Sequence, residues 1–216
     1  WCSSCRTALA EAEVEYDDHT SPSIFVKMPF AADVGDVLPE LGGAETALVI
    51  WTTTPWTIPA NLAVVAWPSY TYVALKVDGA FLIVAEDLAD NFLEATGLTA
   101  DERIKIDIEK LEGRKYRHPL TGDRKENDYR LWFADHVTLE AGTGLVHTAP
   151  GHGGDDYKVG MQHDLDVYAP VDDSGQFTEE VPAYQGTQVH AANDAVKKDL
   201  QAAGALLNPP DQSITH

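Results

Sequence analysis

The stretch Thr46-Ala-Leu-Val-Ile-Trp-Thr-Thr-Thr-Pro-Trp-Thr-Ile-Pro-Ala-Asn61 joins an apolar run to a cluster of hydroxyl groups. Its first six residues, 46–51, have the continuous apolar character of a strand buried in a sheet. Pro55 and Pro59 then stop regular pairing, because proline has no backbone N–H to donate. A second apolar run, 62–66, follows directly. The stretch therefore predicts two buried strands joined by an irregular, threonine-rich segment.

Short strands and a few helices are expected in the rest of the chain. Asp78-Gly79 lies between the apolar runs 70–76 and 80–84, which predicts a β-hairpin. Alternation over 103–108 predicts a half-buried strand. This pattern is typical of an α+β fold, mainly β, built round a barrel-like sheet with peripheral helices. We also expect strands over 24–28, 135–139 and 144–148, helices over 86–96, 157–163 and 192–203, loops over 33–43 and 114–127, and a turn over 172–175.

The composition is that of one globular domain. The chain has 216 residues, of which 44% are hydrophobic and 23% charged. No apolar run approaches the roughly 18 residues that span a membrane, so we expect no membrane partner. The sequence has no initiator Met and no signal peptide pattern, and we interpret it as a piece of a longer protein. We expect a linker remnant over 1–20, the folded domain over 21–207 and a second linker over 208–216.

The charge is strongly negative. Fifteen basic and 35 acidic residues give a formal net charge of −20. This argues against broad binding to nucleic acid phosphates, which needs many Lys and Arg contacts. If the substrate is RNA, we expect few and local contacts to a single-stranded end. Other domains would then hold the rest of the RNA.

Cys2 and Cys5 are the only cysteines. A structural zinc ion takes four ligands, often from two such Cys-x-x-Cys pairs. We therefore interpret this pair as half of a split structural zinc site, or as a linker remnant without metal.

The threonine segment offers four hydroxyls and one amide within ten residues. Threonine favours strands, so a threonine-rich strand and bend without further function is one interpretation. The other is a binding wall, because hydroxyls at a strand end suit a water molecule and a carbonyl oxygen.

A second segment, Gly142-Thr-Gly-Leu-Val-His-Thr-Ala-Pro-Gly-His-Gly-Gly-Asp-Asp-Tyr157, combines glycines with ionisable side chains. It lacks the lysine of a phosphate-binding Walker loop. His147, His152, Asp155 and Asp156 suggest a metal-dependent hydrolase. Alternatively, one carboxylate binds an ammonium group through a charge-assisted hydrogen bond. Chemistry alone thus predicts a hydrolytic or binding pocket between the two segments.

At these two segments the sequence resembles the connective-polypeptide insertion of class I aminoacyl-tRNA synthetases for branched aliphatic amino acids. It is most similar to the editing domain of the bacterial form of the isoleucine enzyme. The valyl and leucyl relatives typically have Thr-Thr-Arg-Pro at the first segment and lack a histidine at the position of His147. The resemblance extends to Cys2-Ser-Ser-Cys5 and the following 8–16, and covers nearly the whole chain.

The resemblance implies post-transfer editing, the hydrolysis of valine wrongly attached to isoleucine tRNA. Isoleucyl-tRNA synthetase is the standard example of this double-sieve strategy. By position, Asp156 would anchor the α-amino group. Thr52, Thr53 and Thr54 would contact the terminal adenosine and orient the attacking water, and these four are the expected catalytic residues. The remaining expected substrate-binding residues are His147, which would exclude isoleucine, and Trp56 and Asn61, which would complete the pocket.

The expected partners are the 3′-terminal aminoacyl-adenosine of tRNA(Ile), its valine moiety and the other domains of the synthetase, in the cytoplasm. The whole enzyme would attach isoleucine to tRNA with ATP. No cofactor is expected for editing, and structural zinc only in the full-length enzyme. The absence of an activated nucleophile favours a positioned water and the ribose hydroxyl of the substrate. The alternatives are a non-catalytic module that binds aminoacyl-adenosine or an RNA 3′ end, and the editing domain of a valyl or leucyl relative.

Overall fold

Strand β3 (Thr46–Thr52) is an interior strand of the largest sheet and pairs on both sides. It runs antiparallel to β2 (Ile24–Pro29) and parallel to β6 (Ala80–Ala85). These pairings are seen in a computed structural model, which describes residues 2, 5–8, 10 and 20–215. The predicted buried strand over 46–51 is confirmed, as is the strand over 24–28.

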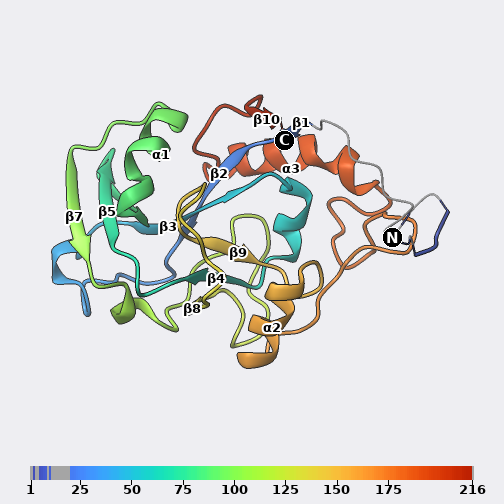
Figure 1. Ribbon diagram of the computed structural model, residues 1–216, viewed down its shortest axis with the longest axis horizontal. Helices are drawn as coiled ribbons and strands as arrows, with labels where there is room; N and C mark the ends of the chain where they lie inside the picture. The colour runs from blue at the N-terminus through green and yellow to red at the C-terminus, as the bar shows by residue number, and fades with distance from the viewer. Residues whose placement is uncertain (1, 3–4, 9, 11–19, 216) are drawn as a thin grey trace.

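The largest sheet has five strands in the order β2-β3-β6-β5-β7 (Figure 1). Strands β5 (Tyr72–Val77) and β6 form the predicted hairpin. Asp78 and Gly79 turn the chain with positive φ values of 50° and 83°, as a two-residue hairpin turn requires. Strand β7 (Glu102–Ile106) pairs with β5 at the sheet edge, where half-burial accounts for its alternating pattern.

Both faces of β3 are buried, which explains its continuous apolar run. Ala47 and Val49 pack on one face with Phe92 of helix α1 (Ala89–Thr96). Leu48 and Ile50 belong to the main core on the other face. The predicted helix over 86–96 forms with a first 3-10 turn, η4 (Glu86–Leu88), and ends at Gly97 with φ 69°.

A second sheet has the order β8-β4-β9 and stands beside the first (Figure 1). It contains β4 (Ala63–Ala66), β8 (Arg130–Phe133) and β9 (Val146–Thr148). In the described part of the chain a third, two-stranded sheet pairs β1 (Thr20–Pro22) with β10 (Ser213–Thr215). The α+β, mainly β prediction is confirmed. Over the residues described, however, the strands form separate sheets and no closed barrel, so "barrel-like" is only a loose term.

The predicted strand over 135–139 is wrong. The strand of this region is β8, which ends at Phe133, and the chain turns at Asp135 and His136. The apolar side chains that suggested a strand pack singly: Val137 contacts Val65 and Val159, whereas Leu139 packs on the main core.

The loop over 114–127 is confirmed, and the loop over 33–43 contains one 3-10 turn, η2 (Pro39–Leu41). A further 3-10 turn, η5 (Ile108–Leu111), follows β7.

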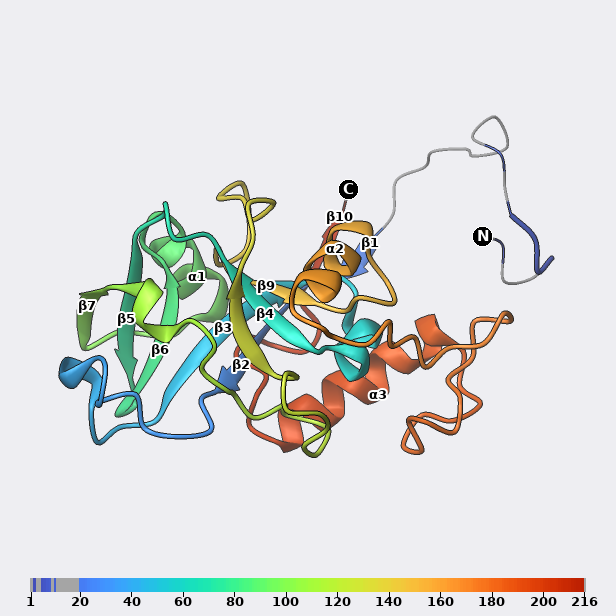
Figure 2. The same cartoon turned by 90° about the horizontal axis from the view of Figure 1, so that it is seen from below.

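Helices α2 (Gly154–Gln162) and α3 (Val189–Ala202) lie near the predicted ranges, and each begins three residues earlier than expected. Gly153 and Gln188 have extended backbone conformations, and the helices begin at the residues that follow them. Figure 2 shows α3 along the lower edge of the picture, and this helix packs against the 3-10 helix η3 (Pro55–Ala60). Among helices formed by described residues, none has the length and apolar character needed to cross a membrane.

The C-terminal segment begins with a residue that is bonded to the domain. Asn208 is buried and ties the tail to β2: its Oδ1 accepts from Phe25 N–H at 2.7 Å, and its Nδ2 donates to the Ser23 carbonyl at 2.8 Å. The linker proposed for 208–216 therefore begins with a residue that packs on the domain. Most of the linker proposed for 1–20, including 11–19, lies outside the described residues.

Candidate active site

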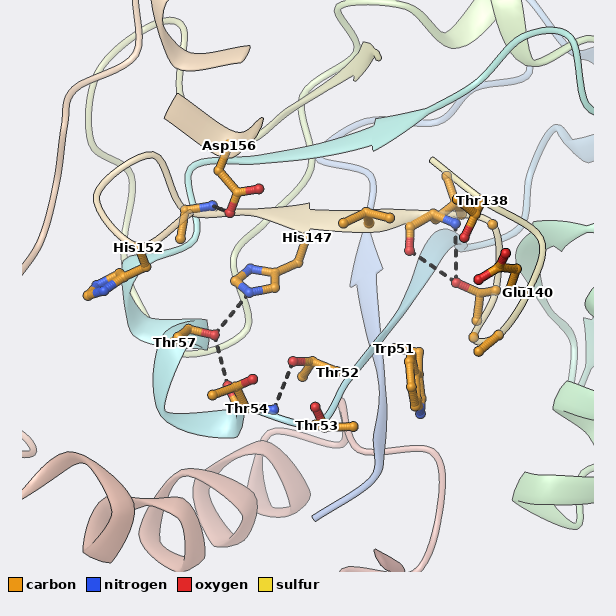
Figure 3. Close-up of a pocket in the computed structure, with 17 residues that line it drawn as sticks. Trp51, Thr52, Thr53, Thr54, Thr57, Thr138, Glu140, His147, His152 and Asp156 are labelled. Carbon is orange, nitrogen blue, oxygen red and sulfur yellow. Dashed lines mark hydrogen bonds between the residues drawn. The ribbon is translucent and has the colours of Figure 1, made fainter. Parts of the chain in front are cut away.

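A cavity of about 450 Å³ lies where β3 ends, β9 passes and α2 begins. The two segments singled out in the sequence form its opposite walls. In Figure 3, Thr52, Thr53 and Thr54 line one side and Asp156 the other, with His147 between them. Five of the residues predicted to act on substrate are thus brought to a single cavity.

The threonine wall exists because β3 cannot continue past Thr52. Pro55 begins the 3-10 helix η3, so the backbone folds back under the end of the strand. The Thr54 N–H donates to Thr52 Oγ1 at 3.0 Å. Thr57 closes the turn, since its N–H and its hydroxyl both donate to the Thr54 carbonyl, at 3.0 and 2.8 Å. These bonds fix the three threonines at the cavity edge.

Asp156 lies in the first turn of α2 and lines the cavity. Its Oδ2 accepts a hydrogen bond from the backbone N–H of Ala149 at 3.0 Å. Burial raises the pKa of the Asp156 carboxyl above its ordinary value of 3.8, although the Ala149 N–H opposes this shift. A partly desolvated carboxylate gains more from a cationic partner than an exposed one does. The site therefore suits an ammonium group.

His147 projects from the middle of β9 and bonds at both ring nitrogens. Its Nε2 lies 3.0 Å from Thr57 Oγ1, and its Nδ1 lies 3.2 Å from Asn61 Nδ2. Burial lowers the pKa of His147 to about 4, so the ring is neutral at physiological pH.

Two of the predicted substrate-binding residues do not line the cavity. Asn61 is fully buried behind His147, so it reaches the cavity only through that ring. Trp56 lies on the far side of the threonine turn, where its backbone N–H donates to Asn193 Oδ1 at 3.0 Å. Its ring packs edge-on against His152 and His190, with centroids 5.2 and 6.4 Å away. Neither side chain is among the residues that line the cavity, and the expectation that both touch substrate stays a prediction.

No protein-family model matches the chain. Over 213 residues, 98% of its length, it is 51% identical to isoleucine–tRNA ligase of Desulfotalea psychrophila. Over 207 residues, 96% of its length, it is 49% identical to isoleucine–tRNA ligase of Geobacter sulfurreducens. By sequence, the chain belongs to the isoleucine–tRNA ligase family. It spans 22% of the length of each of these relatives.

Solved structures show the same fold in the leucine branch of these synthetases. GlLeuRS-CP1 superposes with a TM-score of 0.66 at 16% identity, covering 88% of this chain and 99% of that one. The editing domain of Plasmodium knowlesi cytosolic leucyl-tRNA synthetase gives a TM-score of 0.62 at 13% identity, covering 87% and 96%. At such low identity the likeness shows the fold alone. This member of the isoleucine–tRNA ligase family therefore has the fold of a synthetase editing domain.

The structure also adds cavity residues that sequence reasoning did not select. Thr57 belongs to the same threonine-rich segment as the three predicted threonines and lines the cavity with them. Trp51 provides a flat wall, and Thr138 and Glu140 close the same end (Figure 3). His152, weighed only as a metal ligand, lines the opposite end. No local pattern marks Thr138 or Glu140, because a loop far along the chain brings them to the cavity.

The metal hypotheses find little support in the geometry. The described residues contain no group of three or more His, Cys, Asp and Glu side chains that could hold a metal ion. Asp155 points to Lys158, with Nζ 2.7 Å from its Oδ1, and both are exposed. Near the N-terminus, Cys5 N–H donates to Cys2 Sγ at 3.3 Å, and this bonded thiol raises the pKa of Cys5. Two thiols provide half of a zinc ligand set, so a structural zinc site that includes Cys2 and Cys5 stays a prediction.

Proposed function

We propose that this chain hydrolyses the ester that links a misattached valine to tRNA(Ile). One observation carries the proposal: a half-buried carboxylate, Asp156, faces the Thr52–Thr54 hydroxyls across one cavity. The fold and the family provide the context, since the chain is about 50% identical to isoleucine–tRNA ligases and folds as an editing domain.

Asp156 would bind the α-amino group of the aminoacyl ester. At physiological pH this amine carries a positive charge, which pairs with the carboxylate through a charge-assisted hydrogen bond. The Ala149 N–H holds one carboxylate oxygen in place before substrate arrives. The ester carbonyl, one carbon further along, would then lie toward the threonine wall.

Thr52, Thr53 and Thr54 would position the attacking water and the carbonyl oxygen. In the reaction the water oxygen bonds to the ester carbon and the bond to the ribose oxygen breaks. The ribose oxygen takes the proton of the water, so the products are valine and tRNA with a free terminal hydroxyl. The threonine hydroxyls would stabilise the charge that develops on the carbonyl oxygen. The cavity lining contains neither serine nor cysteine among its described residues, and its threonine hydroxyls would hold the water and the carbonyl oxygen, so the proposed nucleophile is water.

His147 would select substrates by size. It lies between the amine anchor and the threonine wall, where the aliphatic side chain of the substrate would fit (Figure 3). Valine is one methylene smaller than isoleucine, and a pocket that attaches isoleucine to tRNA rejects valine poorly by itself. A second cavity that admits only the smaller side chain improves translation fidelity without requiring stronger binding.

The tRNA body and the other synthetase domains are the proposed partners, in the cytoplasm where tRNA is charged. The formal net charge of −20 repels phosphates, so this chain would contact mainly the terminal aminoacyl-adenosine. The relatives are several times longer, and ATP-dependent attachment of isoleucine would belong to their other parts.

A deacylation assay tests the proposal. The chain is incubated with valyl-tRNA(Ile) and, separately, with isoleucyl-tRNA(Ile), and release of each amino acid is measured. We expect valine release well above the spontaneous rate and at least about tenfold faster than isoleucine release. Binding of a non-hydrolysable valyl-adenosine mimic without turnover would instead support the non-catalytic module. Absence of both binding and turnover would overturn the assignment of this cavity.

A further inference from the structure

The orientation of the Asn61 amide is fixed by one neighbour. Its Nδ2 lies 2.7 Å from the Ala63 carbonyl oxygen. A carbonyl oxygen only accepts hydrogen bonds, so the amide nitrogen, and not its oxygen, must face Ala63. The Asn61 oxygen then points to Tyr116, whose hydroxyl donates to Asn61 Oδ1. Because both Asn61 and Tyr116 are fully buried, these groups have no water to turn toward.

This orientation decides which nitrogen of His147 carries the proton. The second hydrogen of Asn61 Nδ2 points to His147 Nδ1, 3.2 Å away, so Nδ1 must accept. A neutral imidazole has one protonated nitrogen, which is therefore Nε2. Nε2 lies 3.0 Å from Thr57 Oγ1, and the Thr57 hydroxyl donates onward to the Thr54 carbonyl at 2.8 Å. Every bond in the series runs in the same direction, from Tyr116 through Asn61, His147 and Thr57 to Thr54.

We propose that Asn61 and Tyr116 are positioning residues that hold His147 as its neutral Nε2–H tautomer. His147 is then a donor to Thr57, with no free nitrogen for substrate. It presents carbon atoms to the cavity and cannot act there as a general base. Through Thr57 it also fixes the Thr54 carbonyl, and with it the turn that carries the threonine wall. The importance of this tautomer for editing rests on the proposed function, whereas the assignment of the tautomer rests on the hydrogen bonds alone.

The surroundings of the ring favour the same state. Among the described residues, the ionisable groups that act on His147 are His118 and His152, and neither is a carboxylate that would stabilise an imidazolium. Burial and these two histidines lower the pKa of His147 to about 4. A protonated Nδ1 would also face the Asn61 hydrogens, which adds repulsion to desolvation.

Nitrogen NMR of the whole chain with ¹⁵N-labelled histidine measures the tautomer directly. His147→Gln removes one set of ring signals and so assigns them. We expect the His147 signals of the unaltered chain to show protonated Nε2 and unprotonated Nδ1 at neutral pH. A proton on Nδ1, or a charged ring, would refute the proposal whether or not the variants fold.

Asn61→Asp provides the second arm. It keeps the shape of the side chain but places an acceptor beside Nδ1, so the proton should move to Nδ1 and the pKa of His147 should rise from about 4. Asn91→Asp makes the same change on the exposed surface of α1 and should leave the His147 signals unaltered. If Asn61→Asp folds and the tautomer stays as in the unaltered chain, Asn61 does not control it. The NMR experiments measure no turnover, so they test the tautomer of His147 even if the deacylation assay finds no activity.

Discussion

Asp156 Oδ2 lies 3.0 Å from the backbone nitrogen of Ala149, and this hydrogen bond closes the loop between β9 and α2. The bond satisfies a backbone donor just past the end of a strand and holds the carboxylate at the cavity wall. It also lowers the pKa of Asp156, in opposition to the larger effect of burial. The residue is thus positioned at some cost to the folded state, which is common where side chains serve chemistry.

Asp156→Asn should separate activity from stability. The substitution keeps an oxygen to accept the Ala149 N–H but removes the charge that would bind the amine, so deacylation should fall by about 100-fold or more. Since the folded state raises the pKa of Asp156, the ionised carboxylate costs folding free energy, and a variant with a neutral side chain should unfold at the same or a higher temperature. Asp155→Asn, next to it but exposed and paired with Lys158, is the control and should keep full activity. Equal activity in the two variants would remove Asp156 from the site.

Gly153→Ala should disturb the same carboxylate by steric contact. A Cβ at Gly153 would lie 2.9 Å from Asp156 Cγ and Oδ2, so the side chain must shift. We expect deacylation to fall by roughly tenfold, because small displacements of positioned groups are costly. At Gly154 a Cβ meets no atom within 4 Å, and Gly154→Ala should retain activity and gain up to about 1 kcal/mol of helix stability. If Gly153→Ala reacts as fast as Gly154→Ala, the contact has no importance for catalysis.

Two buried threonines should respond in opposite ways to replacement by valine. Thr148 is fully buried, and no described residue offers its Oγ1 a hydrogen bond. Thr148→Val should therefore stabilise the fold by about 1 kcal/mol in urea unfolding. Thr143 is equally buried, but its hydroxyl lies 2.6 Å from the Val49 carbonyl. Thr143→Val should destabilise by about 1–2 kcal/mol, and the same sign for both variants would contradict this account.

Stability should fall as the pH drops from about 6.5 toward 4, because of His118. Burial lowers its pKa from 6.5 to about 4, and its Nδ1 accepts from Leu120 N–H and Thr121 N–H, so the folded state needs the neutral ring. The unfolded chain protonates first, hence the full contribution exists above pH 6.5 and decreases below it. The loss at pH 5 should be on the order of 2 kcal/mol from His118, and His147, whose pKa is also lowered to about 4, adds to this loss.

Urea unfolding at pH 7.5 and pH 5.0 measures this difference. The exposed His190 provides the comparison: His190→Gln should keep the pH dependence of the unaltered chain. A chain that is equally stable at both pH values would show that His118 is not held neutral by the fold.

Local patterns were sufficient for most elements. The apolar run over 46–51 predicts β3 because a strand that is buried on both faces needs apolar side chains at successive positions. Asp78-Gly79 predicts the β5–β6 hairpin because its turn joins two strands that follow one another in the chain. The strand expected over 135–139 failed because a short segment with apolar side chains is equally compatible with a loop from which they pack singly. Periodicity also cannot separate one curved sheet from several, which is why the barrel-like description was too specific.

The sequence by itself determined the chemistry available to this protein. It supplied the hydroxyls of Thr52–Thr54, a histidine and a carboxylate in two segments, and identified both as walls of one pocket. Only the tertiary structure decided what each group does, since that depends on partners distant in the chain. His147 meets Thr57 across 90 residues and Asn61 across 86, and these contacts place Asn61, which was expected to bind substrate, behind the His147 ring. Whether a polar side chain faces substrate or protein is set by burial, which no local pattern contains.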